Sequence, residues 1–176
     1  THKNIVIGAK TVTEYVENME DEVILALLTF SFDAGLNQLT TCFKMGAKLV
    51  LKTYLFANDV IETMVKENVT ALAAIPPIWV QLLQATNIGK YNFKHLRYIT
   101  NTGGKLSVAH IKQLRQVFPY TKIYSMYGFT EAFRCTYLDP NQIDIRPDSI
   151  GKTVPHSECF VVNDLGEECK PGEVGE

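Results

Sequence analysis

The sequence lacks the features that mark several large classes of protein. Its 176 residues carry a net charge of −2 and contain no basic run, so nothing favours nucleic-acid binding. No apolar run reaches the roughly 18 residues that a membrane-spanning helix needs. The four cysteines form no CxxC pair, and their spacing fits neither a zinc site nor a disulfide scaffold. We therefore expect reduced thiols and a cytoplasmic protein without a membrane span.

What is present is the composition of an ordinary globular domain. Hydrophobic residues make up 46% of the chain and charged residues 20%, and the length suits one domain. The first residues include neither an initiator methionine nor a signal peptide. The last five, 172–176, resemble the middle of a hairpin. We therefore expect an internal fragment of a longer protein.

Helix-length segments alternate with short apolar strands as far as residue 126. This order predicts an α/β fold with a mostly parallel sheet and helices on both faces. The second strand is expected to be buried, and Asn58 or Asp59 to cap the helix after it. Strands are expected at 23–28, 47–51, 71–75, 96–101 and 122–126. Helices are expected at 4–17, 34–44, 60–67 and 76–85, and from the Ser107 cap to a stop before Phe118.

The residue composition of the chain changes after Pro140. Proline and glycine separate short segments, with a strand expected at 158–163 and turns at 164–166 and 171–172. We expect an α/β part over residues 1–140 and a small β-rich annex over 141–176 of the same domain.

Three unusual loops follow expected strands and would share one rim of the sheet. In an open parallel sheet, ligands bind outside the carboxyl ends of the strands. The loops at 29–35, 101–105 and 127–131 offer two carboxylates, a glycine pair, an aromatic ring and a hydroxyl. Such a set suits a nucleotide with a metal ion.

The chemistry of each residue type supports that hypothesis. Gly103 and Gly104 would let a flat base approach the backbone, and Tyr127 could stack on that base. The Thr130 hydroxyl can donate to a phosphate oxygen. Glu131 offers the hard oxygen ligand that Mg²⁺ prefers.

Each of these residues also has a purely structural interpretation. The glycine pair can be only a turn, and Tyr127 a packed ring. Thr130 with Glu131, and also Asp33, can cap helices. Composition and spacing alone leave both interpretations open.

The run Tyr127-Gly128-Phe129-Thr130-Glu131 resembles the YGxTE signature of the adenylate-forming superfamily. That group includes acyl- and aryl-CoA synthetases, firefly luciferase and the adenylation domains of nonribosomal peptide synthetases. Further segments are similar to the family's elements in the same order, so the resemblance covers essentially the whole chain: 1–4, 69–77, 96–104, 149–152 and 172–176. Residues 31–36 and 130–134 most resemble acyl-CoA ligases associated with bacterial exosortase systems. The resemblance implies a fragment of the AMP-binding N-terminal domain.

The resemblance implies roles on the nucleotide side of the site. Catalytic roles would fall to Thr130, at the α-phosphate, and to Glu131, which would coordinate Mg²⁺. The expected nucleotide-binding residues are Gly103, Gly104, Lys105, Tyr127, Gly128 and Thr130.

The resemblance also implies an acyl pocket. Asp33 matches the FDxS aspartate with which peptide-synthetase domains hold a substrate's α-amino group, although a helix cap remains an equal alternative. Arg134 could bind a carboxylate with two hydrogen bonds, or lie in a surface salt bridge. The other residues expected to border the pocket are Asn37, Thr100, Thr102, Met126 and Cys135.

The implied activity is ATP-dependent activation of a small carboxylic acid. Acyl-AMP would form first, and then an acyl thioester with coenzyme A. The alternatives are an amino-acid adenylating enzyme that loads the phosphopantetheine of an acyl carrier protein, and a noncatalytic nucleotide-binding module. The expected ligands are ATP or AMP and Mg²⁺. The family's phosphate loop, ribose-binding aspartate and catalytic lysine have no counterpart here, so we expect the fragment itself to be inactive.

Overall fold

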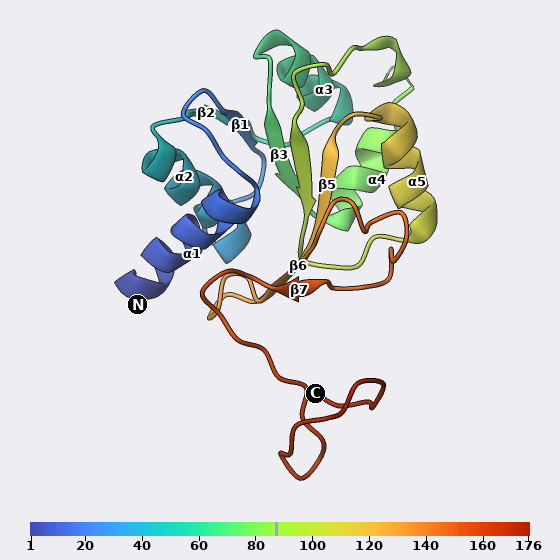
Figure 1. Cartoon of the computed structure of the whole chain (residues 1–176). Helices are drawn as coiled ribbons and strands as arrows, with labels where there is room; N and C mark the ends of the chain where they lie inside the picture. The colour runs from blue at the N-terminus through green and yellow to red at the C-terminus, as the bar shows by residue number, and fades with distance from the viewer. Residues whose placement is uncertain (87) are drawn as a thin grey trace.

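The computed structural model describes residues 1–86 and 88–176, and in these residues one seven-stranded sheet organises an α/β fold (Figure 1). The helices are α1 (His2–Tyr15), α2 (Asp33–Met45), α3 (Ala57–Lys66), α4 (Pro76–Gln84) and α5 (Val108–Val117), with the 3₁₀ turn η1 (Ile88–Lys90). The strands are β1 (Val23–Ala26), β2 (Lys48–Leu51), β3 (Ala71–Ala74), β4 (Tyr98–Asn101), β5 (Lys122–Tyr127), β6 (Thr136–Leu138) and β7 (Lys152–Thr153).

The strand order is β2-β1-β3-β4-β5-β6-β7. Strands β1 to β5 pair in parallel, and β6 and β7 are added antiparallel. The mostly parallel sheet predicted from the sequence is therefore confirmed. The chain leaves β1 for β2 on one side and then returns to β3 on the other, so the direction of winding reverses there. Crevices for ligands form at such a reversal.

Helices cover both faces of the sheet, as predicted: α1 and α2 on one, and α3, α4 and α5 on the other (Figure 1). Because side chains alternate between the faces of a strand, the parallel strands supply two separate cores. One core contains Leu25, Leu72, Ile99 and Ile123 with the fully buried Trp79. The other contains Ile24, Ala71, Tyr98 and Tyr124 with Tyr15 of α1.

Local sequence signals fix several helix ends as expected. Gly46 follows α2 with φ of 68°, a left-handed conformation that glycine adopts without the steric cost of a Cβ. The Ser107 side chain accepts a hydrogen bond from the His110 backbone N at 3.2 Å and caps α5. Pro76 opens α4, where its fixed φ suits the first helical turn.

Two local predictions were wrong. β2 is the edge strand of the sheet, with both of its end residues exposed, so it is not buried on both faces. Neither Asn58 nor Asp59 caps α3, because the helix begins at Ala57 and Phe56 takes the cap position without a side-chain hydrogen bond. Asp59 still lies in the first turn, where the positive end of the helix dipole favours a carboxylate.

The segment after residue 156 is less regular than expected. The strand predicted at 158–163 is reduced to one isolated bridge between Val162 and Glu168, while turns form at both predicted places. This segment extends away from the sheet and helices (Figure 1). The division of the chain near residue 140 stays a prediction. Within residues 1–86 and 88–176, no helix is long and apolar enough to cross a membrane.

A buried ion pair stabilises the rim at the amino ends of the strands. Glu22 is 1% exposed and accepts a hydrogen bond from Arg97 Nε at 2.9 Å. The Thr70 hydroxyl also donates to this carboxylate. Because a buried carboxylate needs such partners, the network has a structural explanation at the rim opposite the three loops.

Candidate nucleotide and acyl site

The glycine loop after β4 packs closely on the start of α4. Gly103 has φ of 72°, and a Cβ on it would lie 3.0 Å from Ile75 Cγ2. A Cβ on Gly104 would lie 3.2 Å from Pro76 Cγ. The Asn101 side chain holds the loop by donating from Nδ2 to Gly104 O at 2.8 Å. The loop is thus a fixed stretch of backbone at the carboxyl end of β4, as an adenine site would require.

The loop after β5 reverses tightly and presents its tip to solvent. Cys135 N donates to Tyr127 O at 2.9 Å, so β5 passes through residues 128–134 directly into its pairing with β6. A Cβ on Gly128 would lie 2.5 Å from Phe133 O, which only glycine avoids. The Tyr127 ring is half exposed, and its centroid lies 6.3 Å from that of Phe129. An exposed ring at a strand end can accept a stacked base.

One cavity brings predicted residues from two distant loops together. It has a volume of about 240 Å³. Asp33, from the start of α2, lines it together with Thr130 and Glu131. The Glu131 backbone also accepts a hydrogen bond from Asn4 Nδ2 at 3.2 Å, which ties the loop to α1. The loops after β1 and β5 therefore meet over one hollow, as their shared rim predicted.

Asp33 and Arg134 form an ion pair that neither of the two sequence interpretations anticipated. Arg134 Nη1 lies 2.7 Å from Asp33 Oδ2, and the side chains are 4% and 16% exposed, respectively. Asp33 is the first residue of α2, and Phe32 is its N-cap, so the helix-cap interpretation of Asp33 was wrong. The surface salt bridge considered for Arg134 was also wrong, because the arginine side chain is buried and Asp33 is only partly exposed.

Four more of the predicted pocket residues, Asn37, Thr100, Thr102 and Met126, are buried on the same side of the sheet. Met126 Sδ accepts a hydrogen bond from the Tyr15 hydroxyl at 3.3 Å. Asn37 follows Asp33 by one helical turn, and its Nδ2 has no hydrogen-bond partner. Thr100 and Thr102 are buried along and just after β4.

Lys105 and the cysteines contribute less to this site. Lys105 Nζ pairs with Asp148 at 2.6 Å, and both side chains are largely exposed, so the lysine is engaged away from the glycine loop. Burial raises the pKa of the Cys135 thiol and Cys159 raises it slightly further, while the positive charge of Arg134 acts in the opposite direction. This thiol is therefore mostly protonated and weakly nucleophilic at neutral pH.

The side chains present suit a nucleotide better than an independent metal site. Among residues 1–86 and 88–176, no group of three or more His, Cys, Asp or Glu side chains is placed to hold a metal ion. Glu131 offers one exposed carboxylate beside the Thr130 hydroxyl. Mg²⁺ often binds through one or two carboxylates and completes its shell with phosphate oxygens and water. The single carboxylate therefore fits an ion that arrives with the nucleotide.

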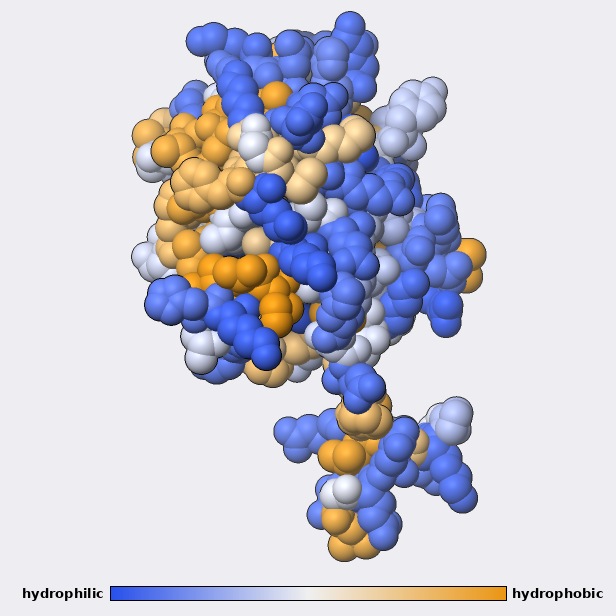
Figure 2. Space-filling model, turned by 60° about the vertical axis from the view of Figure 1, so that its left-hand side comes forward, coloured by the Kyte–Doolittle hydropathy of each residue, from blue (hydrophilic) through white to orange (hydrophobic). Residues whose placement is uncertain are grey.

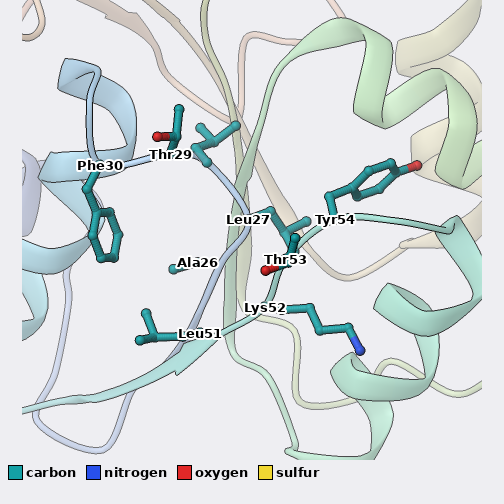
Figure 3. Close-up of a pocket in the computed structure, with 9 residues that line it drawn as sticks. Ala26, Leu27, Thr29, Phe30, Leu51, Lys52, Thr53 and Tyr54 are labelled. Atoms are coloured by element: carbon teal, nitrogen blue, oxygen red, sulfur yellow. The ribbon is translucent and has the colours of Figure 1, made fainter.

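Sequence reasoning missed a larger hollow at the carboxyl ends of β1 and β2. It has a volume of about 590 Å³, and Ala26, Phe30, Leu51 and Tyr54 are among its lining residues (Figure 3). Apolar side chains also cover much of the face on the side of α1, α2 and β2 (Figure 2). The exposed ones in this part of the chain include Phe43, Leu51, Leu55 and Phe56. The continuous apolar run at residues 23–28 gave no hint of this hollow, because a buried strand explained it.

A comparison with known protein families identifies the family to which the chain belongs. A family model described as AMP-binding enzyme matches residues 1–176. The chain belongs to the AMP-binding enzyme family. This confirms the resemblance drawn from the YGxTE run and the segments around it.

Curated relatives of this AMP-binding chain include two kinds of ligase. An uncharacterized acyl-CoA ligase, YhfT of Bacillus subtilis, is 26% identical over 167 residues, covering 94% of this chain and 33% of that protein. The L-proline–[L-prolyl-carrier protein] ligase of Streptomyces coelicolor is 27% identical over 164 residues, covering 89% of this chain and 31% of that protein. The chain therefore spans about a third of the length of these two relatives.

Solved structures show the same fold. The complex of VinN with L-aspartate superimposes with a TM-score of 0.86 at 25% identity, covering 98% of this chain and 42% of that one. The O-succinylbenzoate coenzyme A synthetase of Bacillus subtilis, solved with ATP and magnesium, superimposes with a TM-score of 0.88 at 24% identity. That alignment covers 98% of this chain and 35% of the synthetase. The α/β architecture is thus the one found in the AMP-binding domains of this family.

Proposed function

We propose that this chain is the acid- and nucleotide-binding part of an ATP-dependent ligase that forms an acyl-adenylate and then an acyl-CoA thioester. The observation that carries the proposal is the meeting of Asp33, Thr130 and Glu131 around one cavity in a chain of the AMP-binding family. The glycine loop and Tyr127 end on the same rim of the sheet.

The roles of the residues follow from their chemistry. Gly103, Gly104 and Tyr127 would hold the adenine between a bare backbone and a ring. The Thr130 hydroxyl would donate to a phosphate oxygen, and Glu131 would hold Mg²⁺. The bound ion would neutralise negative charge on the phosphates, and the chain's own part would be positioning. The carboxylic acid would lie toward Asn37, Thr102 and Met126, which stay predictions as pocket residues.

A second candidate is an amino-acid adenylating enzyme that loads a carrier protein. It is favoured by the aspartate at position 33 and by the relative that acts on L-proline and a prolyl-carrier protein. The Arg134 side chain beside Asp33 argues against it. Localisation in the cytoplasm stays a prediction.

Acid-dependent ATP–pyrophosphate exchange tests the proposal. We would use the protein expressed from its whole gene, with fatty, aryl and amino acids as substrates. Glu131→Gln should lower exchange by about 100-fold or more, because it removes the only carboxylate proposed for the metal. Glu158→Gln is the matched control, because it makes the same change at an exposed position in the segment that extends from the body.

Two further results would separate the candidates. Formation of a CoA thioester on addition of coenzyme A would support the proposal, whereas transfer only to a carrier protein would favour the second candidate. Absence of exchange with every acid, or full exchange by Glu131→Gln, would contradict the proposed function.

A further inference from the structure

Asp33 already has a counter-ion within the protein. Arg134 Nη1 lies 2.7 Å from Asp33 Oδ2 and also donates to Phe133 O at 2.6 Å. Phe133 has φ of 56°, so the backbone turns at the residue before the arginine in a way that few side chains favour. The pair is therefore built by a specific conformation of the loop after β5.

An incoming ammonium group would have to share the single Asp33 carboxylate with Arg134, or break this pair. A guanidinium stays charged at any pH at which proteins fold, so Arg134 cannot become neutral to make room. With a 4% exposed side chain, it would be left buried beside a second positive charge. Like charges brought together in a desolvated site are strongly unfavourable.

Two side-chain donors, one in the ion pair and one on α2 beside it, are left without partners. Arg134 Nε and Asn37 Nδ2 are both buried without a hydrogen-bond partner. Asn37 lies four residues after Asp33 on α2, which places both on one face of the helix. An ammonium group has three donors and no acceptor, so these unpaired donors cannot bind it. A hydroxyl, carbonyl or carboxylate oxygen could satisfy them.

We infer that Arg134 is a specificity-determining residue that occupies Asp33 and so selects acids without an α-amino group. The inference rests on the proposed function, because it assumes that the acid lies beside Asp33. It identifies the substrate class as carboxylic acids that present oxygen acceptors or apolar groups, rather than amino acids.

Matched pairs of adenylate mimics test the inference by binding. Each pair is an acyl-sulfamoyl adenosine with and without the α-amino group: alanyl and propanoyl, leucyl and 4-methylpentanoyl, phenylalanyl and 3-phenylpropanoyl. Isothermal titration with the protein expressed from its whole gene should give at least about 10-fold tighter binding for the member without the amine in whichever pair fits.

Substitution of Arg134 should reverse this preference. In Arg134→Leu, Asp33 loses its counter-ion, and the amino-bearing mimic should bind tighter than its partner. Arg115→Leu is the matched control, because the partly buried Arg115 pairs with the exposed Asp144 at 3.1 Å, outside the proposed site. The Arg115→Leu variant should keep the wild-type preference between the two mimics. The wild-type comparison remains decisive if Arg134→Leu fails to fold.

The possible results distinguish a failure of this inference from a failure of the proposed function. Equal or tighter wild-type binding of the amino-bearing mimics would overturn the inference and leave the proposed function standing. Failure of the wild type to bind any mimic or AMP would overturn the proposed function and the inference with it. An unchanged preference in a folded Arg134→Leu variant would show that another residue sets the specificity.

Discussion

The Asp33–Arg134 pair should be costly to break and nearly neutral to replace. Asp33→Leu leaves a buried guanidinium with Phe133 O as its remaining acceptor, so we expect a loss of about 3–5 kcal/mol in the free energy of unfolding. Arg134→Met should cost less, about 2–3 kcal/mol. The cost is smaller because Asp33 remains partly exposed without Arg134 and lies at the positive end of the α2 dipole. That dipole stabilises the remaining carboxylate by up to about 1 kcal/mol.

The double variant Asp33→Leu/Arg134→Met should lie within about 1 kcal/mol of the wild type, because apolar replacement of a buried pair leaves no unpaired charge. Urea unfolding of residues 1–176, followed by the fluorescence of Trp79, measures all four free energies. The single tryptophan is fully buried, so its emission reports loss of the core. The reasoning would be refuted if the double variant lost as much free energy of unfolding as the two single variants together. It would also be refuted if each single variant lost less than about 0.5 kcal/mol.

Three further predictions concern other parts of the chain. In urea unfolding, Gly35→Ala should lower the free energy of unfolding by about 3 kcal/mol or more, because the new Cβ would meet the backbone of residues 28–29, with Leu28 O at 2.7 Å. A Cβ on Gly89 would lie in open space, so Gly89→Ala should change the free energy of unfolding by under about 0.5 kcal/mol. Equal losses in the two variants would contradict this prediction. Burial raises the pKa of Cys42 to about 11. At pH 8, iodoacetamide should therefore label the exposed Cys159 about 100-fold faster than the buried Cys42. Similar labelling rates of the two cysteines, measured by mass spectrometry, would contradict the burial of Cys42. Ser107→Ala should lower stability by about 1 kcal/mol and Ser107→Asn by only a few tenths, and a harmless alanine would mean that the cap is not formed in solution.

Much of the fold follows from local patterns in the sequence. Strands such as Val23–Ala26 are short apolar runs between helix-length segments, and this order already implies a parallel sheet. Ser107 and Gly46 mark helix ends by chemistry that depends on few neighbours. Position within the sheet is not local, and for this reason the edge placement of β2 was missed.

The candidate site divides along the same line. The rim loops could be predicted, because parallel strands place their carboxyl ends together. The pairing of Asp33 with Arg134 joins residues 101 positions apart, and no spacing rule connects them. The strand expected at 158–163 failed for a different reason: that segment pairs at one bridge and is largely exposed, so its apolar residues bury little surface.

The most direct test of the central claim is trapping of the activated acid with hydroxylamine. The protein expressed from its whole gene would be incubated with ATP, Mg²⁺ and the acid that gives the highest exchange, and the hydroxamate would be quantified. The account predicts hydroxamate that requires both ATP and the acid and falls about 100-fold in Glu131→Gln. Hydroxamate absent from every acid in the panel, or formed equally by Glu131→Gln, would contradict it.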